Sequence, residues 1–310
     1  MQKLKDVAAA AVFVLLFPCV VLLFSGKEVS FRKVSEKDGA SEGYYIRTEH
    51  GAASETLDLK TYTLGAAAAV LWADCEEEMM KAQMVLVRTN LLRKIQEAGE
   101  DHTISEAQLS EVYMEPELQR RKFGSEFETF WERLTKAGED TEGWILTFEG
   151  EPVEAAYHLV SSGRTRMGSE VLDGEYPYLQ PVECAEDRYA KDYLMRKEIS
   201  GEEWRATLEA AGYDPDAELQ IAVRDASGYV CRIKLGEQVL GGEEFRRLFD
   251  LNSADFFIEE GGLGKIITTK GVGHGLGMSQ YGANVYAENG ADFREILARF
   301  FPGTELKKIE

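Results

Sequence analysis

One stretch near the end of the chain combines unusual backbone freedom with side chains that can do chemistry. It reads GVGHGLGMSQYGAN, from Gly271 to Asn284, and four of its five glycines surround His274 and precede Gln280 and Tyr281. Each glycine in ordered structure costs roughly 0.5–1 kcal/mol relative to alanine. Glycines at every second position from 271 to 277 would leave one face of an extended segment bare, with His274 on the other face. Two interpretations stay open: a close approach to a flat ligand or backbone, or a tight strand crossing around a buried histidine.

The glycine spacing excludes a dinucleotide-binding fingerprint. The stretch is predicted to follow a strand and precede a helix, which is the setting of G-x-G-x-x-G. Counted from Gly271, however, the third glycine would fall at Leu276, and counts from Gly273 or Gly275 also fail.

Bulk composition limits the partners. Of the 310 residues, 44% are hydrophobic, which is enough to form a core. The net charge of −20 is acidic enough to repel nucleic acid. We therefore expect no nucleic-acid partner. Four cysteines are widely spaced, without a C-x-x-C pair, so neither a zinc cluster nor a disulfide framework is indicated.

The N-terminus predicts a membrane anchor. Residues 7–24 form an apolar run of 18 residues, about 27 Å as a helix, close to the ~30 Å hydrocarbon core of a bilayer. No small-x-small cleavage site follows, which favours an uncleaved anchor over a removed signal peptide. We expect an anchor at 1–26, a polar tether at 27–43, and one exported domain at 44–310 in the cell membrane, facing the cell wall or the septal space.

Helices are predicted to dominate the first half of the domain. Asp58 is a cap for a helix that begins at Leu59, and Asp74 with Glu77 forms a capping box for the next helix. Arg93 and Lys94 are expected near the end of that second helix. Its buried stripe is predicted at Met80, Met84, Val87, Leu91 and Ile95.

Strand patterns dominate the second half. Residues 144–158 alternate like a hairpin that turns near Gly150, and further strands are predicted in ELQIAVRD, YVCRIKLGEQVL, FFIEE and GKIITTKG. A short helix, GGEEFRRLF, and a C-terminal helix, GADFREILARFF, interrupt or follow them. Mixed helices and strands without regular βαβ alternation predict an α+β fold.

Five blocks in series resemble the stage II sporulation protein D family, which also includes amidase-enhancer proteins. They cover residues 44–310 in register. The glycine–histidine block is the most specific, and the others are KAQMVLVRT (81–89), AAYHLVSSGRT (155–165), PYLQPVEC (177–184) and LFDLNSADFFIE (248–259). The resemblance implies a membrane-anchored protein that acts on septal peptidoglycan during engulfment, as a lytic transglycosylase that cuts denuded glycan strands.

The resemblance also implies a catalytic glutamate, which this chain lacks. In the family it lies eleven residues before the lysine of the K-A-Q block; counting back from Lys81 reaches Val70, and the family's glycine five residues earlier matches Gly65. A lytic transglycosylase needs a carboxyl group that protonates the leaving oxygen and later accepts a proton. Valine cannot do this.

Three interpretations follow. The protein is a binding or scaffolding relative without the chemistry; or an acid between Asp74 and Glu78, such as Asp74 or Glu77, replaces the missing one; or a small insertion shifts the helix. The constant spacing from Gly65 argues against the third. Those four acids, which include Glu76, also suit a helix cap and a solvated first turn.

The remaining groove positions of the family are retained, and each also suits a buried hydrogen-bonding role. Lys81 and Arg88 are predicted to meet a muramic-acid carboxylate, and Tyr178 or Tyr281 to stack on a sugar. The substrate-binding set implied by the resemblance is Lys81, Gln83, Arg88, His158, Tyr178, His274, Gln280 and Tyr281.

We expect neither a metal nor a cofactor. Some family members carry a zinc site of clustered His and Cys before the Y-H block, but residues 100–150 offer only His102 and no cysteine. The partners expected are glycan strands and a cell-wall amidase or an active paralogue. Two functions remain as alternatives: a glycan-binding protein without catalysis, and an active lytic transglycosylase.

Overall fold

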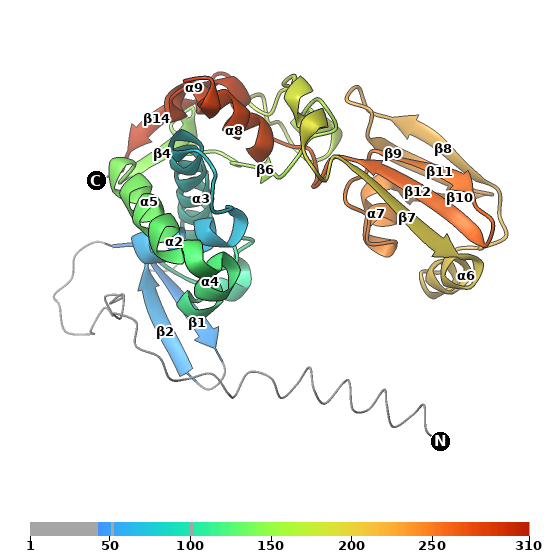
Figure 1. The fold of residues 1–310 in the computed structure, drawn as a ribbon, viewed down its shortest axis with the longest axis horizontal. Coiled ribbons are helices and arrows are strands. Elements are labelled where there is room, and N and C mark those ends of the chain that lie inside the picture. Colours follow the sequence, from blue (N-terminus) through green and yellow to red (C-terminus); the bar gives the residue numbers. More distant parts are fainter. Residues whose placement is uncertain (1–42, 51–52, 100–101, 310) are drawn as a thin grey trace. The chain divides into compact units, whose positions relative to one another are not determined.

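The computed structural model describes residues 43–50, 53–99 and 102–309, which belong to one folded unit. The predicted anchor at 7–24 lies outside these residues, as does all of the predicted tether except Gly43. Within the described ranges, no helix has both the length and the apolar character needed to cross a bilayer. The mixture of helices and strands confirms the predicted α+β class (Figure 1).

Three helices, α2, α3 and α5, pack on one another through the first half of the chain (Figure 1). Asp58 caps α2 as predicted, because its Oδ1 accepts a hydrogen bond from the Thr61 N–H at 2.7 Å. The stripe predicted on α3 is fully buried. The helices of this half are α2 Leu59–Val70, α3 Glu77–Ala98, α4 Pro116–Phe123 and α5 Phe127–Asp140.

The predicted cap at the start of α3 is wrong, and the basic residues expected at its end lie before the last turn. Its N-cap is Glu76, which makes no side-chain capping bond, so the Asp74–Glu77 capping box does not form. The helix continues to Ala98 and ends at Gly99 in the left-handed conformation, with no basic residue in its last turn. Left-handed backbone at this position is the commonest helix stop, and glycine adopts it without strain.

Two small sheets flank these helices. In the first, β1 pairs antiparallel with β2 and parallel with β3; in the second, β4 pairs antiparallel with β5 and β14. The predicted hairpin is confirmed at its turn, since Phe148 pairs with Glu151 around Glu149 and Gly150, but it ends at Pro152. Tyr157 and His158 pair instead with Met278 and Ser279. The strands are β1 Tyr45–His50, β2 Ala53–Asp58, β3 Thr103–Ser105, β4 Trp144–Phe148, β5 Glu151–Pro152 and β14 Glu305–Lys308.

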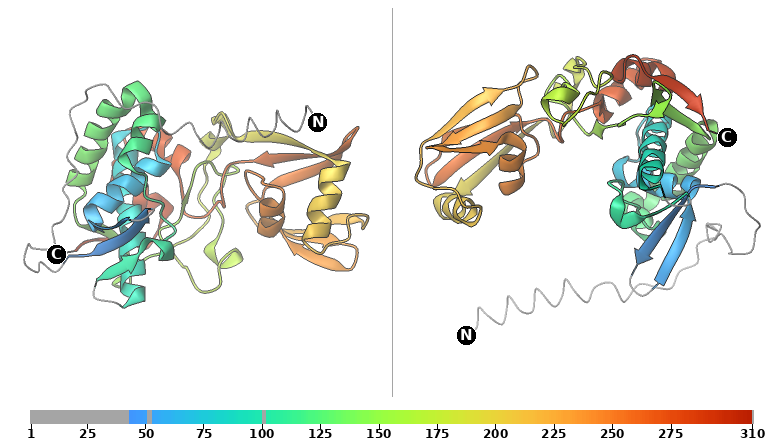
Figure 2. Two further views of the ribbon diagram at one scale, coloured as in Figure 1. Left: turned by 90° about the horizontal axis from the view of Figure 1, so that it is seen from below. Right: turned by 180° about the vertical axis from the view of Figure 1, so that it is seen from behind.

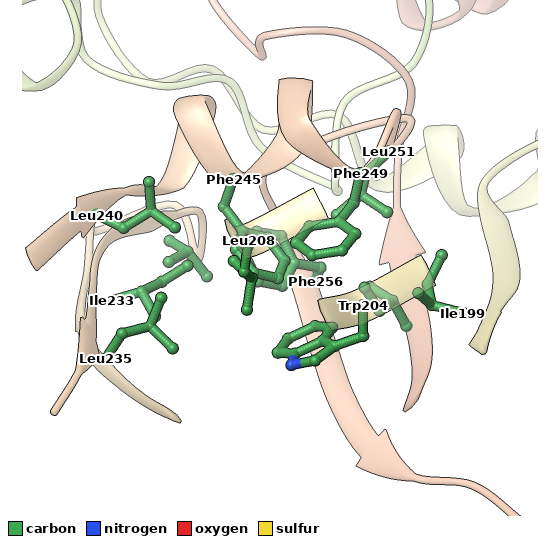
Figure 3. Packing of buried hydrophobic residues seen from close by; sticks show 12 residues of the cluster. Ile199, Trp204, Leu208, Ile233, Leu235, Leu240, Phe245, Phe249, Leu251 and Phe256 are labelled. Carbon is green, nitrogen blue, oxygen red and sulfur yellow. The ribbon is translucent and has the colours of Figure 1, made fainter. Parts of the chain in front are cut away.

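Residues 194–270 build a second core from two three-stranded sheets and two helices. Figure 3 shows aromatic rings from α6, α7 and β11 packed together, with Trp204 stacked on Phe249 at 4.9 Å and Phe245 on Phe256 at 4.9 Å. The sheet orders are β10-β9-β8 and β11-β12-β7. The elements are β7 Leu194–Ser200, α6 Gly201–Ala210, β8 Leu219–Arg224, β9 Val230–Leu235, β10 Gln238–Gly241, α7 Gly242–Leu248, β11 Phe256–Glu260 and β12 Gly264–Lys270.

The chain then returns to the helical half. After β12, the glycine-rich stretch leads into β13 Met278–Ser279 and α8 Gln280–Glu288, followed by α9 Phe293–Phe300. Helices α8 and α9 lie side by side and both contact α3 (Figure 2). Strand β13 pairs in parallel with β6 Tyr157–His158, so the Y-H block and the glycine–histidine block meet through backbone hydrogen bonds.

Candidate functional site

The glycine-rich stretch passes within contact distance of residues 156–161. A Cβ on Gly277 would lie 2.0 Å from the Ala156 carbonyl oxygen, and one on Gly273 would lie 2.7 Å from the His158 Cβ. Both glycines have positive φ, 65° and 110°. The predicted close approach is therefore real, but the segment is not the extended strand that the period of two suggested. Its glycines permit this close contact, and they also adopt a left-handed backbone conformation that other residues rarely adopt.

His158 from the Y-H block and His274 from the glycine–histidine block lie close together and adopt opposite tautomers. Nδ1 of His158 lies 2.9 Å from the Leu276 carbonyl, which can only accept, so this nitrogen carries the proton. Nδ1 of His274 instead accepts from the Leu276 N–H at 3.0 Å, which places its proton on Nε2. The ring centroids are 5.8 Å apart. The backbone of Leu276 thus fixes both tautomers.

Burial keeps both rings neutral. It lowers the pKa of His158 to about 3, with nearby His274 acting in the same direction, and it also lowers the pKa of His274. Nε2 of His158 is an acceptor with no hydrogen-bond partner among the described residues. The Nε2 lone pair of His158 is therefore enclosed within the protein and lacks a donor among the described residues.

Two motif glutamines link the end of α2 at Val70 to α3 and α8. Val70 ends α2, and its carbonyl oxygen lies 3.4 Å from Nε2 of Gln280, the first residue of α8. The same Nε2 donates to Oε1 of Gln83 on α3 at 3.0 Å. Nε2 of Gln83 is buried without a partner among the described residues. Three segments far apart in sequence therefore meet at the backbone of Val70.

The end of α2 is also held by a cation. Lys122 donates from Nζ to the carbonyl oxygens of Ala68 at 2.9 Å and Ala69 at 2.8 Å. Burial lowers the pKa of this lysine. A cation at a helix C-terminus offsets the partial negative charge there, so a carboxylate placed at residue 70 would meet a compensated helix end.

The four acids after Val70 differ in their partners. Asp74 is exposed, whereas Glu76 forms the N-cap of α3 and Glu77 begins that helix. Glu78 is held on both sides, because Oε1 pairs with Lys81 at 2.7 Å and Oε2 accepts from the Phe293 N–H at 2.8 Å.

Three other predicted groove residues make contacts within the helical half, away from the histidine pair. Lys81 pairs with Glu78 and, at 3.2 Å, with Asp140; burial lowers its pKa, but these two partners outweigh burial and the net shift is upward. Arg88 is buried and donates to the Thr141 and Trp144 carbonyls, and burial lowers its pKa to about 10. Tyr178 accepts from the Glu154 N–H at 2.9 Å. Their contact with a glycan stays a prediction.

The remaining predicted residue, Tyr281, lies next to the glutamine pair. It is half-buried near the start of α8, and its N–H donates to the Leu159 carbonyl at 3.0 Å. The structure therefore joins Gln83 and Gln280 to the backbone of Val70 and separately pairs His158 with His274.

One buried acid at this site was missed by the sequence reasoning. Oδ2 of Asp187 accepts from the Ser161 N–H at 2.6 Å and from the Ser279 hydroxyl at 2.7 Å, and burial raises its pKa. Ser279 is the N-cap of α8 and faces His158 across the β6–β13 pair. Because Asp187 lies 92 residues from Ser279, no local pattern could have revealed it.

A second missed group secures the glycine-rich stretch. Nε of Arg166 donates to Oδ2 of Asp225 at 2.6 Å, with both side chains almost wholly buried, and Nη1 bonds Glu243 at 2.8 Å. The same Nη1 lies 3.3 Å from the His274 carbonyl oxygen. This arginine directly follows the AAYHLVSSGRT block, and no sequence pattern indicates its partners.

Among the described residues, no group of three His, Cys, Asp or Glu side chains is arranged to hold a metal ion. Cys75, Cys184 and Cys231 are free thiols.

Comparison with known proteins agrees with the motif geometry. Residues 48–148 match the family model described as stage II sporulation protein. The stage II sporulation protein D of Bacillus amyloliquefaciens is 29% identical over 261 residues, which cover 83% of this chain and 76% of that protein. The chain belongs to the stage II sporulation protein D family. That of Bacillus subtilis gives the same identity and coverage, and the amidase enhancer of Bacillus subtilis is 24% identical over 55% of this chain and 32% of its own length.

The family-model match contains the helix that ends at Val70. The glycine–histidine block lies outside that match, and the structure joins it to Val70 through the glutamine pair.

Proposed function

We propose that this protein binds glycan strands of cell-wall peptidoglycan and has little or no lytic transglycosylase activity. It would act in septal remodelling during engulfment, anchored in the membrane by residues 7–24, with the domain at 44–310 facing the wall. The expected partners are denuded strands and a cell-wall amidase or an active paralogue that the protein would recruit or stimulate.

One observation supports this proposal most: a bonded pair of motif glutamines lies against the backbone of residue 70, where the family resemblance implies a carboxyl group and the chain has an isopropyl group. Gln280 reaches the Val70 carbonyl, and Gln83 is bonded to Gln280. Losing a general acid typically lowers rates by 10²–10⁴. Polar side chains that can form hydrogen bonds with a sugar remain at the motif positions, so sugar binding does not depend on the missing acid.

The second candidate is an active enzyme that uses a substitute acid. Asp74 favours it, since this exposed carboxylate lies four residues after Val70 in the segment between α2 and α3. Exposure argues against it, because a general acid works best when an apolar setting raises its pKa. Glu78 is a poorer candidate, since both of its oxygens have partners.

Glycan retention tests the proposal. Purified full-length protein should sediment with denuded sacculi, and Tyr281→Ala should weaken retention by roughly five- to thirtyfold if its ring stacks on a sugar, as for aromatic contacts of about 1–2 kcal/mol. Tyr189→Ala, at an exposed tyrosine outside the site, is the matched control and should behave like the wild type. Equal retention of all three proteins would remove Tyr281 from the site, and no retention of the wild type would refute glycan binding.

A further inference from the structure

A pocket on the far side of α8 is the clearest unassigned hollow in the described part of the chain. It has a volume of about 310 Å³ and lies between α8, α9 and the segment before residue 187. Its walls include Cys184, Glu186, Val285, Tyr286, Arg299 and Phe300. A sphere of this volume is roughly 8 Å across, which places it at the small end of ligand pockets, suited to one or two amino-acid residues.

Helix α8 separates this pocket from the site at Val70. One face of α8 carries Gly282, Val285, Tyr286 and Asn289, at spacings of three, four and seven, and all four line the pocket. The other face is buried against the start of α3, where Oδ1 of Asn284 accepts from the Glu76 N–H at 2.7 Å. The pocket is therefore a second site on the same helix.

The cation of the pocket is held in place. Nη2 of Arg299 donates to the Glu183 carbonyl at 2.7 Å, and the guanidinium carbon lies 4.9 Å from the centre of the Tyr286 ring. These two contacts orient the guanidinium group of Arg299 and leave its other N–H groups without a partner among the described residues. An oriented guanidinium is the side chain best suited to a carboxylate.

The pocket also carries an opposite charge and an apolar floor. Glu186 lines it and has no hydrogen-bond or ion-pair partner among the described residues, whereas Glu183 is already paired with Arg164 at 3.1 Å. Cys184 and Phe300 are almost fully buried. Burial raises the pKa of the Cys184 thiol to about 12, so this wall is uncharged and unreactive at neutral pH.

We propose that this pocket binds the end of a short peptide that carries a carboxylate and an ammonium group close together. Arg299 receives the carboxylate, Glu186 the ammonium group, and Val285 and Phe300 a small apolar side chain. This deepens the proposed function and rests on it for the source of the ligand: the peptide stems of the same wall polymer. The protein would then sense whether the strand it holds still carries peptide.

The test uses alanyl-alanine, in its L,L and D,D forms, titrated calorimetrically into the purified full-length protein. We expect a Kd of the order of 1 mM, because a ligand of this size makes few contacts. The N-acetyl and carboxamide derivatives, which each lack one charge, should bind at least about tenfold more weakly. Equal binding of all four ligands would overturn the charge assignment.

Variants locate the binding. Arg299→Met and Glu186→Gln should each weaken binding at least about tenfold, since each removes a charged hydrogen-bond partner. Arg188→Met is the matched control, because that arginine stacks on Tyr189 outside the pocket. Unchanged thermal midpoints would show that the variants fold. If Arg299→Met does not fold, Glu186→Gln still tests the pocket, because that residue lies on the surface. Equal losses in the control and the pocket variants would overturn the location.

Sedimentation with denuded sacculi separates the two proposals. A protein that retains strands but does not bind the dipeptide would refute the pocket ligand and leave glycan binding intact. A protein that binds the dipeptide but retains no strands would refute the proposed function and, with it, the wall as the source of the ligand. Binding of both, with Arg299→Met losing only the dipeptide, is the expected result.

Discussion

Gln280 donates a side-chain hydrogen bond to Gln83 across 3.0 Å, joining helices whose residues lie 197 positions apart. Both side chains are buried, and Gln280 also reaches the carbonyl of Val70. This amide pair ties the glycine–histidine block near the C-terminus to the end of α2 at Val70.

The pair predicts a non-additive effect on stability. Gln280→Met alone should lower the free energy of unfolding by about 1–3 kcal/mol, because it leaves the buried amide of Gln83 without its partner. Gln83→Met with Gln280→Met should cost clearly less than the sum of the single changes. Chemical denaturation measures all three, with exposed Gln220→Met as the control. Additive losses would show that the two amides are not coupled.

The neutral His158 predicts sensitivity to acid. Its folded pKa of about 3 lies below the ordinary value of 6.5, so the unfolded chain binds the proton more readily and stability falls as pH drops between these values. From pH 7 to pH 5 this group alone should remove about 2 kcal/mol of unfolding free energy.

The comparison that isolates this effect is His158→Gln against exposed His102→Asn. The His158 variant should lose less stability than the wild type between pH 7 and pH 5, and the His102 variant should follow the wild type. Because burial raises the pKa of Asp187 and so opposes the trend, the difference between proteins is the informative quantity. Parallel curves for all three would contradict the buried, neutral ring.

Gly277 predicts a large penalty for a single methyl group. Alanine there would combine a φ of 65° with a Cβ 2.0 Å from the Ala156 carbonyl oxygen. We expect a loss of at least about 3 kcal/mol, from backbone strain and overpacking together. Gly290→Ala has positive φ but open space around its Cβ, so it should cost only about 1–2 kcal/mol. Similar thermal midpoints for the two variants would mean that the close crossing is not rigid.

Much of the fold follows from local patterns, and the departures have physical causes. The Asp58 cap, the stripe of α3 and the hairpin near Gly150 were predictable because they depend on neighbours in sequence. The start of α3 was not, because the Glu76 N–H is satisfied by Asn284, 208 residues away, and not by the side chain of Asp74.

The site was only partly predictable for the same reason. Motif resemblance identified Gln83, His158 and Gln280, but Asp187 and Arg166 act through partners distant in sequence. Spacing alone suggested an extended glycine segment, whereas contact with residues 156–161 requires left-handed turns. These features depend on contacts between residues that are distant in sequence, and local patterns in a single sequence do not predict such contacts.

The most direct test of the central claim compares the wild type with Val70→Glu on denuded glycan strands, with 1,6-anhydro sugar products quantified by mass spectrometry. Because the surrounding motif residues and the Lys122 cap are in place, the variant should form these products at least about 100-fold faster than the wild type, which should bind strands and release almost none. Wild-type protein that releases products at a rate abolished by Asp74→Asn or Glu77→Gln would contradict the account.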